Sequence, residues 1–259
     1  MKKRNLKFLL TFLCVLFFAL NYSFLDKALV NFLDDSEVIK IDSVIDGDTV
    51  VSNGTSIRLL GVNSPEKGKP YYEEAKLFLE NRILGKKVKL EFGSDKYDKY
   101  DRILAYIYLD NVNVNFEIVE NGFANCYFYE KGLNYYKCQE VWKMCVDLDL
   151  NFCKKSKHKC SDCIKIIEFD DKTEISKFLN KCNFECDLTG WTIKDEGRKI
   201  FKFPDFKIDS GLEFSVIVGS GVSDNKKLYW ERKDYVWTST GDTLFLRDNL
   251  GGLVLWESY

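Results

Sequence analysis

The hydrophobic pattern of the chain changes at a basic, polar stretch, Lys154–Lys159. Before this stretch, runs with the alternation of β-strands are mixed with runs that have the spacing of an amphipathic helix. After it, the apolar runs are short, turn residues separate them, and no helical period is visible. Two such patterns predict two domains with separate cores, and a chain of 259 residues is long enough to supply both.

The first part, residues 38–157, has the element order of a small barrel. Strand-like runs cover residues 38–41, 49–51, 57–62, 88–92 and 103–109. Helical spacing extends from Pro70 to Gly85, recurs around residues 114–119, and covers Tyr135–Val146. Three strands, a helix, two strands and then helices predict an α+β domain on a five-stranded β-barrel of the OB-fold type.

The second part, residues 158–259, contains only strand-like runs. They lie at residues 164–169, 175–179, 191–194, 199–203, 212–218, 243–247 and 253–256. About seven strands in roughly a hundred residues are typical of an all-β, immunoglobulin-like sandwich.

The N-terminus has the features of an export segment. Lys2, Lys3 and Arg4 precede an apolar run from Phe8 to Leu20. This length suits the core of a signal peptide better than a full membrane span, although no clear cleavage site follows. We expect residues 1–25 to be either a signal peptide or a membrane anchor, followed by a linker at residues 26–37. Both alternatives predict a protein that is secreted or anchored to the outer face of the cell membrane.

The cysteines indicate the same compartment. Of nine cysteines, Cys14 lies in the apolar run, which leaves an even set of eight. Behind an export segment such a set predicts disulfides. The spacing of Cys160, Cys163, Cys182 and Cys186 also fits a structural zinc site, which stays the less favoured alternative. With disulfides, His158 is expected to be a solvated residue of the linker.

Charge and histidine content limit the chemistry that an active site could use. The formal net charge of −2 gives no general attraction for a polyanion, so nucleic acid would need local Lys and Arg or a cation. The one histidine, His158, argues against catalysis by a histidine pair. Carboxylates, arginines and a hard cation are the groups that remain.

Three fragments of the first part belong together: Asp46–Thr49, Arg58–Glu66 and Asp98–Tyr106. In this order, with Gly122-Phe123-Ala124 further along, they resemble the staphylococcal nuclease (thermonuclease) family from about Val38 to about Lys155. The resemblance implies a nuclease that hydrolyses phosphodiester bonds of DNA or RNA with calcium.

The residue types suit that chemistry. Phosphodiester hydrolysis develops negative charge on the non-bridging oxygens, and a guanidinium can bind two such oxygens at once. Arg58 and Arg102 are therefore expected to clamp the phosphate from two sides. By resemblance, Glu66 is the general base that activates or positions the attacking water.

Oxygen ligands for a hard cation come from Asp48, Asn63 and the carbonyl of Ser64. The family pattern has a carboxylate where this chain has Asn63. An amide supplies an oxygen but removes one negative charge, so we expect weaker calcium binding.

Four further residues are substrate-binding candidates by resemblance. Lys99 and Tyr100 match family positions that hold the terminal phosphate. Tyr127 and Tyr129 lie near positions that pack on the nucleotide, although alternating aromatic residues on a strand are about as often part of a core.

The second part resembles the lamin-tail family of immunoglobulin-like sandwiches. The resemblance rests on Asp187–Asp195, Phe203-Pro204, Val218–Gly221 and Gly241–Asp248. Since no catalytic constellation is visible there, we expect a binding or targeting module whose ligand the sequence does not identify.

The main hypothesis is thus a calcium-dependent nuclease that acts outside the cytoplasm. One alternative is a nucleic-acid-binding barrel that has lost catalysis. Another is an envelope interaction protein in which the sandwich carries the function. Retention of Arg58, Glu66 and Arg102 together favours the nuclease.

Overall fold

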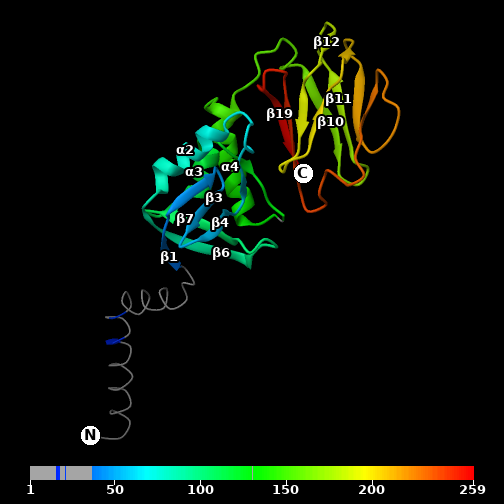
Figure 1. Cartoon of the computed structure of the whole chain (residues 1–259). Coiled ribbons are helices and arrows are strands. Elements are labelled where there is room, and N and C mark those ends of the chain that lie inside the picture. Colours follow the sequence, from blue (N-terminus) through cyan, green and yellow to red (C-terminus); the bar gives the residue numbers. More distant parts are fainter. Residues whose placement is uncertain (1–15, 18–20, 22–36, 130) are drawn as a thin grey trace, which may run out of the picture. The chain divides into compact units, whose positions relative to one another are not determined.

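The computed structural model of the protein describes residues 16–17, 21, 37–129 and 131–259 (Figure 1). The expected signal peptide or anchor at 1–25 and the linker at 26–37 lie almost entirely outside these residues. Among the helices that are described, none is long and apolar enough to cross a membrane. Residues Val38–Tyr259 form one compact unit.

A curled sheet of seven strands, in the order β1-β6-β7-β4-β3-β2 with β8 on β7, forms the barrel. Its strands are β1 (Glu37–Lys40), β2 (Ser43–Asp46), β3 (Thr49–Ser52), β4 (Thr55–Leu59), β6 (Lys87–Tyr97), β7 (Ile103–Leu109) and β8 (Val112–Asn113). The expected α+β barrel is confirmed. Strands β2 and β8 were not among the five expected runs. Strand β2 pairs with β3 up to Asp46, which lies opposite Thr49.

Three helices and a small ribbon complete the barrel. The helices are α2 (Tyr72–Ile83), α3 (Val114–Glu120) and α4 (Leu133–Asp147), followed by the short 3-10 helix η1 (Asn151–Cys153). Helix α2 buries Ala75, Leu79 and Ile83, which is the face that its periodicity predicts. Asn115 of α3 is fully buried and donates to the carbonyl of Leu60 over 2.8 Å, which fixes the chain just before the candidate site.

The expected strand at 57–62 is two separate elements. Strand β4 ends at Leu59, and Val62–Asn63 form β5, which pairs with β9 (Asn125–Cys126) instead. The break is at Gly61, which has a φ of 75°. A Cβ there would lie 2.6 Å from the ring of Phe128, so only glycine fits. This break turns Asn63 away from the main sheet.

The second half is an all-β sandwich, as predicted (Figure 1). One sheet has the order β10-β11-β16-β17 and the other the order β14-β13-β18-β19, and β12 and β15 form a separate pair. The bounds are β10 (Ile164–Asp170), β11 (Ile175–Asn180), β12 (Cys186–Asp187), β13 (Thr192–Lys194), β14 (Ile200–Lys202), β15 (Lys207–Ile208), β16 (Glu213–Val218), β17 (Lys227–Trp230), β18 (Thr243–Arg247) and β19 (Leu253–Ser258). All seven expected runs contain a strand. Strands β12, β15 and β17 are additional.

The two cores are not fully separate. The sandwich has its own core around Trp191, Phe178 and Phe214. However, Phe245 of β18 belongs to the barrel core, where its ring lies 5.1 Å from that of Trp142 on α4. The basic stretch between the domains is also tied down, because Ser156 N donates to the Leu253 carbonyl of β19 over 2.8 Å.

The disulfide prediction is confirmed by four bonds. Two lie in the barrel, at Cys126–Cys138 and Cys145–Cys153. The other two join the start of the sandwich to later residues: Cys163–Cys182 to the loop after β11, and Cys160–Cys186 to the first residue of β12. The four cysteines of the zinc alternative are thus paired with one another. Several disulfides are typical of proteins outside the reducing cytoplasm.

The expectation for His158 was wrong. Its ring lies edge-on to Trp191 with 5.1 Å between the centroids, and its Nδ1 accepts a hydrogen bond from Cys160 N. The histidine is part of the disulfide end of the sandwich and is not freely solvated.

Candidate active site

Arg58 lies at the centre of the candidate site. Its Nε is 3.2 Å from Asp48 Oδ1, and the side chain is only 12% exposed. The guanidinium also donates to the carbonyls of Leu59 and Val62, at the break between β4 and β5. Because backbone carbonyls hold it on one side, the guanidinium has a fixed position and orientation.

Asp48 is hydrogen-bonded to one of the other predicted cation ligands, Ser64. It lies in the tight turn between β2 and β3. A Cβ on Gly47 in this turn would lie 2.7 Å from that of Ser64. Asp48 Oδ2 accepts a hydrogen bond from Ser64 N over 2.7 Å. Asp48, Asn63 and Ser64 are all buried. Asp48 is therefore hydrogen-bonded directly to Ser64, and Asn63 is the residue before Ser64 in the chain.

This donor set fits a hard cation. It offers one buried carboxylate and neutral oxygens, which is the ligand chemistry that calcium prefers. Asp46 lies beside it and accepts a hydrogen bond from Asp48 N. Burial and then the charge of Asp48 raise the pKa of Asp46, and a bound cation would relieve this repulsion.

Glu66 follows the Pro65 turn after β5 and is 48% exposed on its side chain. Its Oε1 is 2.6 Å from Nη2 of Arg198, which lies in the turn between β13 and β14 of the sandwich. The predicted general base thus pairs with a cation from the other domain.

Arg102 lies directly before β7, the strand next to β4. Strand β7 runs parallel to β4, with Leu104 opposite Arg58. The Arg102 guanidinium pairs with Asp98 Oδ2 at 2.7 Å. Burial of Asp98 opposes the effect, but hydrogen bonds from Arg102 lower the pKa of this carboxyl overall. Arg102 therefore contacts its own loop rather than Arg58 or Glu66.

The phosphate-binding candidates on that loop form a small exposed cluster. Tyr100 is 68% exposed. The centre of the Tyr100 ring lies 5.1 Å from Lys99 Nζ and 5.6 Å from Arg102 Cζ. Two cations beside an open aromatic face could contact a phosphate and a base.

Tyr127 and Tyr129 follow β9 and are not part of a strand, contrary to expectation. Their hydroxyl groups are 3.1 Å apart, and Tyr129 is 75% exposed. Burial, followed by the contact with Tyr129, raises the pKa of Tyr127. The core alternative is therefore wrong for Tyr129, while Tyr127 is half-buried near Arg58.

Residues of the sandwich also lie at this site and were not among the predicted site residues. Asn63 Nδ2 donates to the carbonyls of Glu196 and Gly197, over 3.1 and 3.0 Å. Asn125 Nδ2 donates to the same Glu196 carbonyl over 2.9 Å. In sequence, Lys194–Arg198 has the pattern of an exposed, charged turn, and no signal links it to Asn63.

Burial of this turn shifts its ionisable groups. The Glu196 carboxylate accepts from Phe128 N and from Thr243 Oγ1, and burial raises its pKa to about 8. Burial also raises the pKa of Asp242 to about 6 and lowers that of Lys194 to about 8. Each of these groups is thus shifted toward its neutral form.

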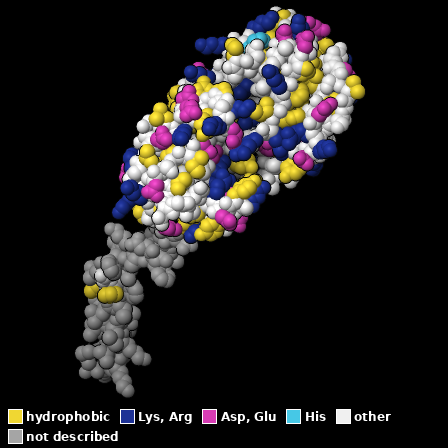
Figure 2. Space-filling view, in the orientation of Figure 1, with side chains coloured by type: hydrophobic (Ala, Val, Ile, Leu, Met, Phe, Trp, Pro, Cys, Tyr) yellow, Lys and Arg dark blue, Asp and Glu magenta, His cyan; other side chains and the backbone are white. Residues whose placement is uncertain are grey.

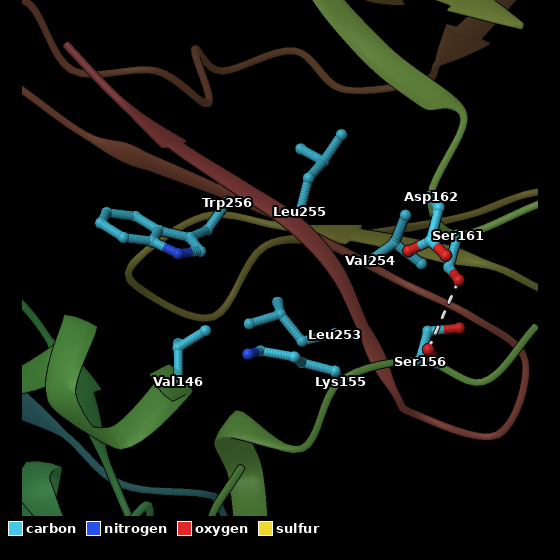
Figure 3. A pocket seen from close by; sticks show the side chains of 9 residues that line it. All are labelled: Val146, Lys155, Ser156, Ser161, Asp162, Leu253, Val254, Leu255 and Trp256. Carbon is cyan, nitrogen blue, oxygen red and sulfur yellow. Dashed lines mark hydrogen bonds between the residues drawn. The ribbon is translucent and has the colours of Figure 1, made fainter. Parts of the chain in front are cut away.

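A separate hollow of about 310 Å³ lies beside β19 (Figure 3). Val146, Lys155 and Trp256 are among the residues that line it, and Ser161 Oγ donates to the Ser156 carbonyl at its rim. None of the predicted site residues borders this hollow.

Two parts of the chain match known protein families. Residues 56–144 match the family described as staphylococcal nuclease homologue, and residues 161–259 match the Lamin Tail Domain. The turn that holds Asp48 precedes the first matched segment.

Several curated proteins are similar to the first domain. The thermonuclease of Staphylococcus hyicus is 32% identical over 111 residues, which cover 39% of this chain and 66% of that protein. The thermonuclease of Staphylococcus intermedius is 33% identical over 99 residues, covering 34% of this chain and 59% of that protein. Endonuclease YncB of Bacillus subtilis is 37% identical over 109 residues, covering 38% of this chain and 52% of that protein. The chain thus spans between 52% and 66% of the length of these relatives. A barrel with a buried carboxylate–arginine pair, matched to these proteins and followed by a disulfide-bonded sandwich, identifies the chain as a staphylococcal nuclease domain followed by a lamin tail domain.

Proposed function

We propose that this protein is a metal-dependent nuclease that hydrolyses phosphodiester bonds of DNA, RNA or both outside the cytoplasm. The observation that carries the proposal is the Arg58 guanidinium, held 3.2 Å from the buried Asp48 carboxylate. Phosphodiester hydrolysis needs positive charge at the phosphate. The Arg58 guanidinium and a metal ion bound to Asp48 could both contact the same phosphate. Several of the proteins to which the first domain is similar are named thermonucleases or endonucleases.

In the proposed mechanism, Arg58 and Arg102 donate hydrogen bonds to the non-bridging oxygens of the scissile phosphate. Glu66 accepts a proton from water as the water oxygen bonds to phosphorus. The ester bond to the leaving sugar oxygen breaks, and that oxygen takes up a proton from solvent. The two guanidinium groups are worth most in the transition state, where charge on the phosphate is greatest.

The cofactor is proposed to be calcium, held by Asp48, Asn63 and the Ser64 carbonyl. When bound, it would polarise the phosphate and offset its charge. Since Asp48 is the one carboxylate in this set, we expect weak binding. Lys99 and Tyr100 are proposed to bind a neighbouring phosphate, and Tyr127 and Tyr129 to contact a base.

The location and domain limits are also proposals. The disulfides favour a place outside the cytoplasm. The N-terminal apolar segment would either be removed on secretion or anchor the protein at the outer face of the membrane. We place the nuclease domain at residues 38–157 and the sandwich at 158–259, with an unidentified ligand for the sandwich.

Cleavage of labelled DNA and RNA by the purified protein, with calcium and with a chelator, tests the proposal. We expect cleavage with calcium, loss with chelator, and recovery when calcium is restored. The Glu66→Gln variant is the control for a contaminating nuclease. A folded wild-type protein that binds nucleic acid and leaves it intact would favour the silent, binding-only alternative.

A further inference from the structure

The contact between Glu66 and Arg198 joins the two domains at the proposed active site. Arg198 Nη2 lies 2.6 Å from Glu66 Oε1. Arg198 lies one residue after Gly197, whose carbonyl accepts from the predicted cation ligand Asn63. The turn between β13 and β14 is therefore next to the proposed base and the proposed cation site at once.

The turn itself is firmly docked on the barrel. Its Glu196 carbonyl accepts from Asn63 and Asn125, and its Glu196 side chain accepts from Phe128 N. Both asparagines are buried. Buried hydrogen bonds of this kind are costly to leave unmade, so the turn stays in place.

The domain that carries the turn is held by a second contact. The rings of Phe245 and Trp256 lie 5.1 and 6.4 Å from that of Trp142 on α4. Trp142 is 1% exposed, so this contact excludes water. The sandwich that carries Arg198 is thus packed on the barrel by an apolar contact as well as by hydrogen bonds.

The ion pair is different from the turn that carries it. The side chains of Arg198 and Glu66 are 70% and 48% exposed. An exposed ion pair between flexible side chains contributes little to stability, and either side chain can readily exchange its partner for another. Such a pair is too weak to lock the site, and a phosphate could take the place of the carboxylate.

We propose that Arg198 is a third phosphate-binding arginine of the nuclease site, supplied by the lamin tail domain. The inference rests on the proposed function. In the free protein the guanidinium pairs with Glu66. On substrate binding it moves to a backbone phosphate of the polynucleotide, which leaves the Glu66 carboxylate free to accept the proton of water.

The neighbouring lysine of the same turn is held elsewhere. Lys199 Nζ donates to the carbonyls of Tyr235 and Val236 in the sandwich, over 2.8 and 3.2 Å. The side chain of Lys199 therefore contacts its own domain, whereas that of Arg198 contacts the barrel. Lys and Arg side chains also gather on the face of the molecule in Figure 2, although the net charge is −2. This local excess suits a polyanion.

The test compares the full-length wild type with Arg198→Ala and Arg198→Lys. Steady-state cleavage of a single-stranded oligodeoxynucleotide with calcium gives KM and kcat. Anisotropy in chelator, at several salt concentrations, gives binding of the same oligonucleotide without cleavage. For Arg198→Ala we expect KM to rise about tenfold, as for the loss of one charge-assisted contact. The slope of log Kd against log salt should fall by about 0.7, which is one phosphate contact on a single strand.

Arg198→Lys keeps the charge, so its salt slope should match the wild type while KM rises less. Lys207→Ala is the matched control, because it removes an exposed sandwich cation that faces Asp187 rather than the barrel. Faster cleavage by Arg198→Ala would indicate an inhibitory contact and overturn the proposal, as would an unchanged KM and salt slope. A wild type that does not cleave, with a salt slope that still depends on Arg198, would remove the proposed function and leave the phosphate contact standing.

Discussion

The side-chain amide of Asn63 in the barrel donates a hydrogen bond of 3.1 Å to the backbone carbonyl of Glu196 in the sandwich. A carboxylate at this position could not donate and would face the carbonyls of Glu196 and Gly197. The neighbouring domain therefore accounts for the amide in place of the carboxylate that the family pattern has. The Asn63 nitrogen serves the interface, and the oxygen of the same amide is the proposed ligand of the cation.

Asn63→Asp should have opposite effects on stability and on calcium binding. Loss of the two hydrogen bonds and repulsion from the carbonyls should destabilise the protein by about 1–3 kcal/mol. The added negative charge should lower the calcium concentration for half-maximal activity. Denaturant unfolding without calcium and a calcium titration of activity measure the two effects separately.

Asn113→Asp is the control for that change. Asn113 caps α3 by accepting from Phe116 N, and aspartate caps a helix equally well. A variant at Asn63 with unchanged stability would contradict the role of the amide in the interface. An equal or greater calcium requirement would contradict its role as a ligand.

Glu66→Gln and Arg102→Ala should each lower kcat at least about a hundredfold, since each removes transition-state stabilisation. Both side chains are partly exposed, so the fold should be retained, and circular dichroism and the unfolding midpoint check this. Near-wild-type turnover by either folded variant would remove that residue from the mechanism.

The buried carboxyl of Asp242 should make stability depend on pH. Burial raises its pKa to about 6, from an ordinary value of 3.8. Because the folded state holds the proton more tightly, this contribution is complete below about pH 4 and is lost as pH rises through 6. The unfolding midpoint of the wild type should therefore fall between about pH 4 and 7, relative to that of Asp242→Asn.

Asp224→Asn provides a comparison of opposite sign. Hydrogen bonds from the backbone of Lys226 and Lys227 lower the pKa of Asp224, so its contribution is lost as pH falls. If the wild type and Asp242→Asn had parallel pH profiles, Asp242 would not be the source of the dependence.

The thiols of Cys160, Cys163, Cys182 and Cys186 should all be oxidised in protein from its native location. Alkylation of the denatured, unreduced chain, followed by intact-mass measurement, should modify none of them. Replacing Cys160 and Cys186 by serine should cost about 3 kcal/mol, from the loop that this bond closes. Stoichiometric zinc, with the four cysteines open to alkylation after chelation, would instead support the metal site.

Much of the fold follows from local pattern. Strands β7 and β18 have the bounds that their apolar runs predict, because a buried face imposes its period on the sequence. The break at Gly61 was missed, because the ring that leaves no room for a Cβ there, that of Phe128, is far along the chain. The contact between Asn63 and Glu196 was missed for the same reason. No periodicity encodes a hydrogen bond between residues 133 positions apart.

The buried face of Trp142 limits how these two domains can be inherited. Its indole is covered by Phe245 and Trp256 of the sandwich. A gene rearrangement that removed the second domain would leave this apolar face open to water and prone to association. The nuclease and its tail are therefore expected to evolve as one unit rather than as exchangeable modules.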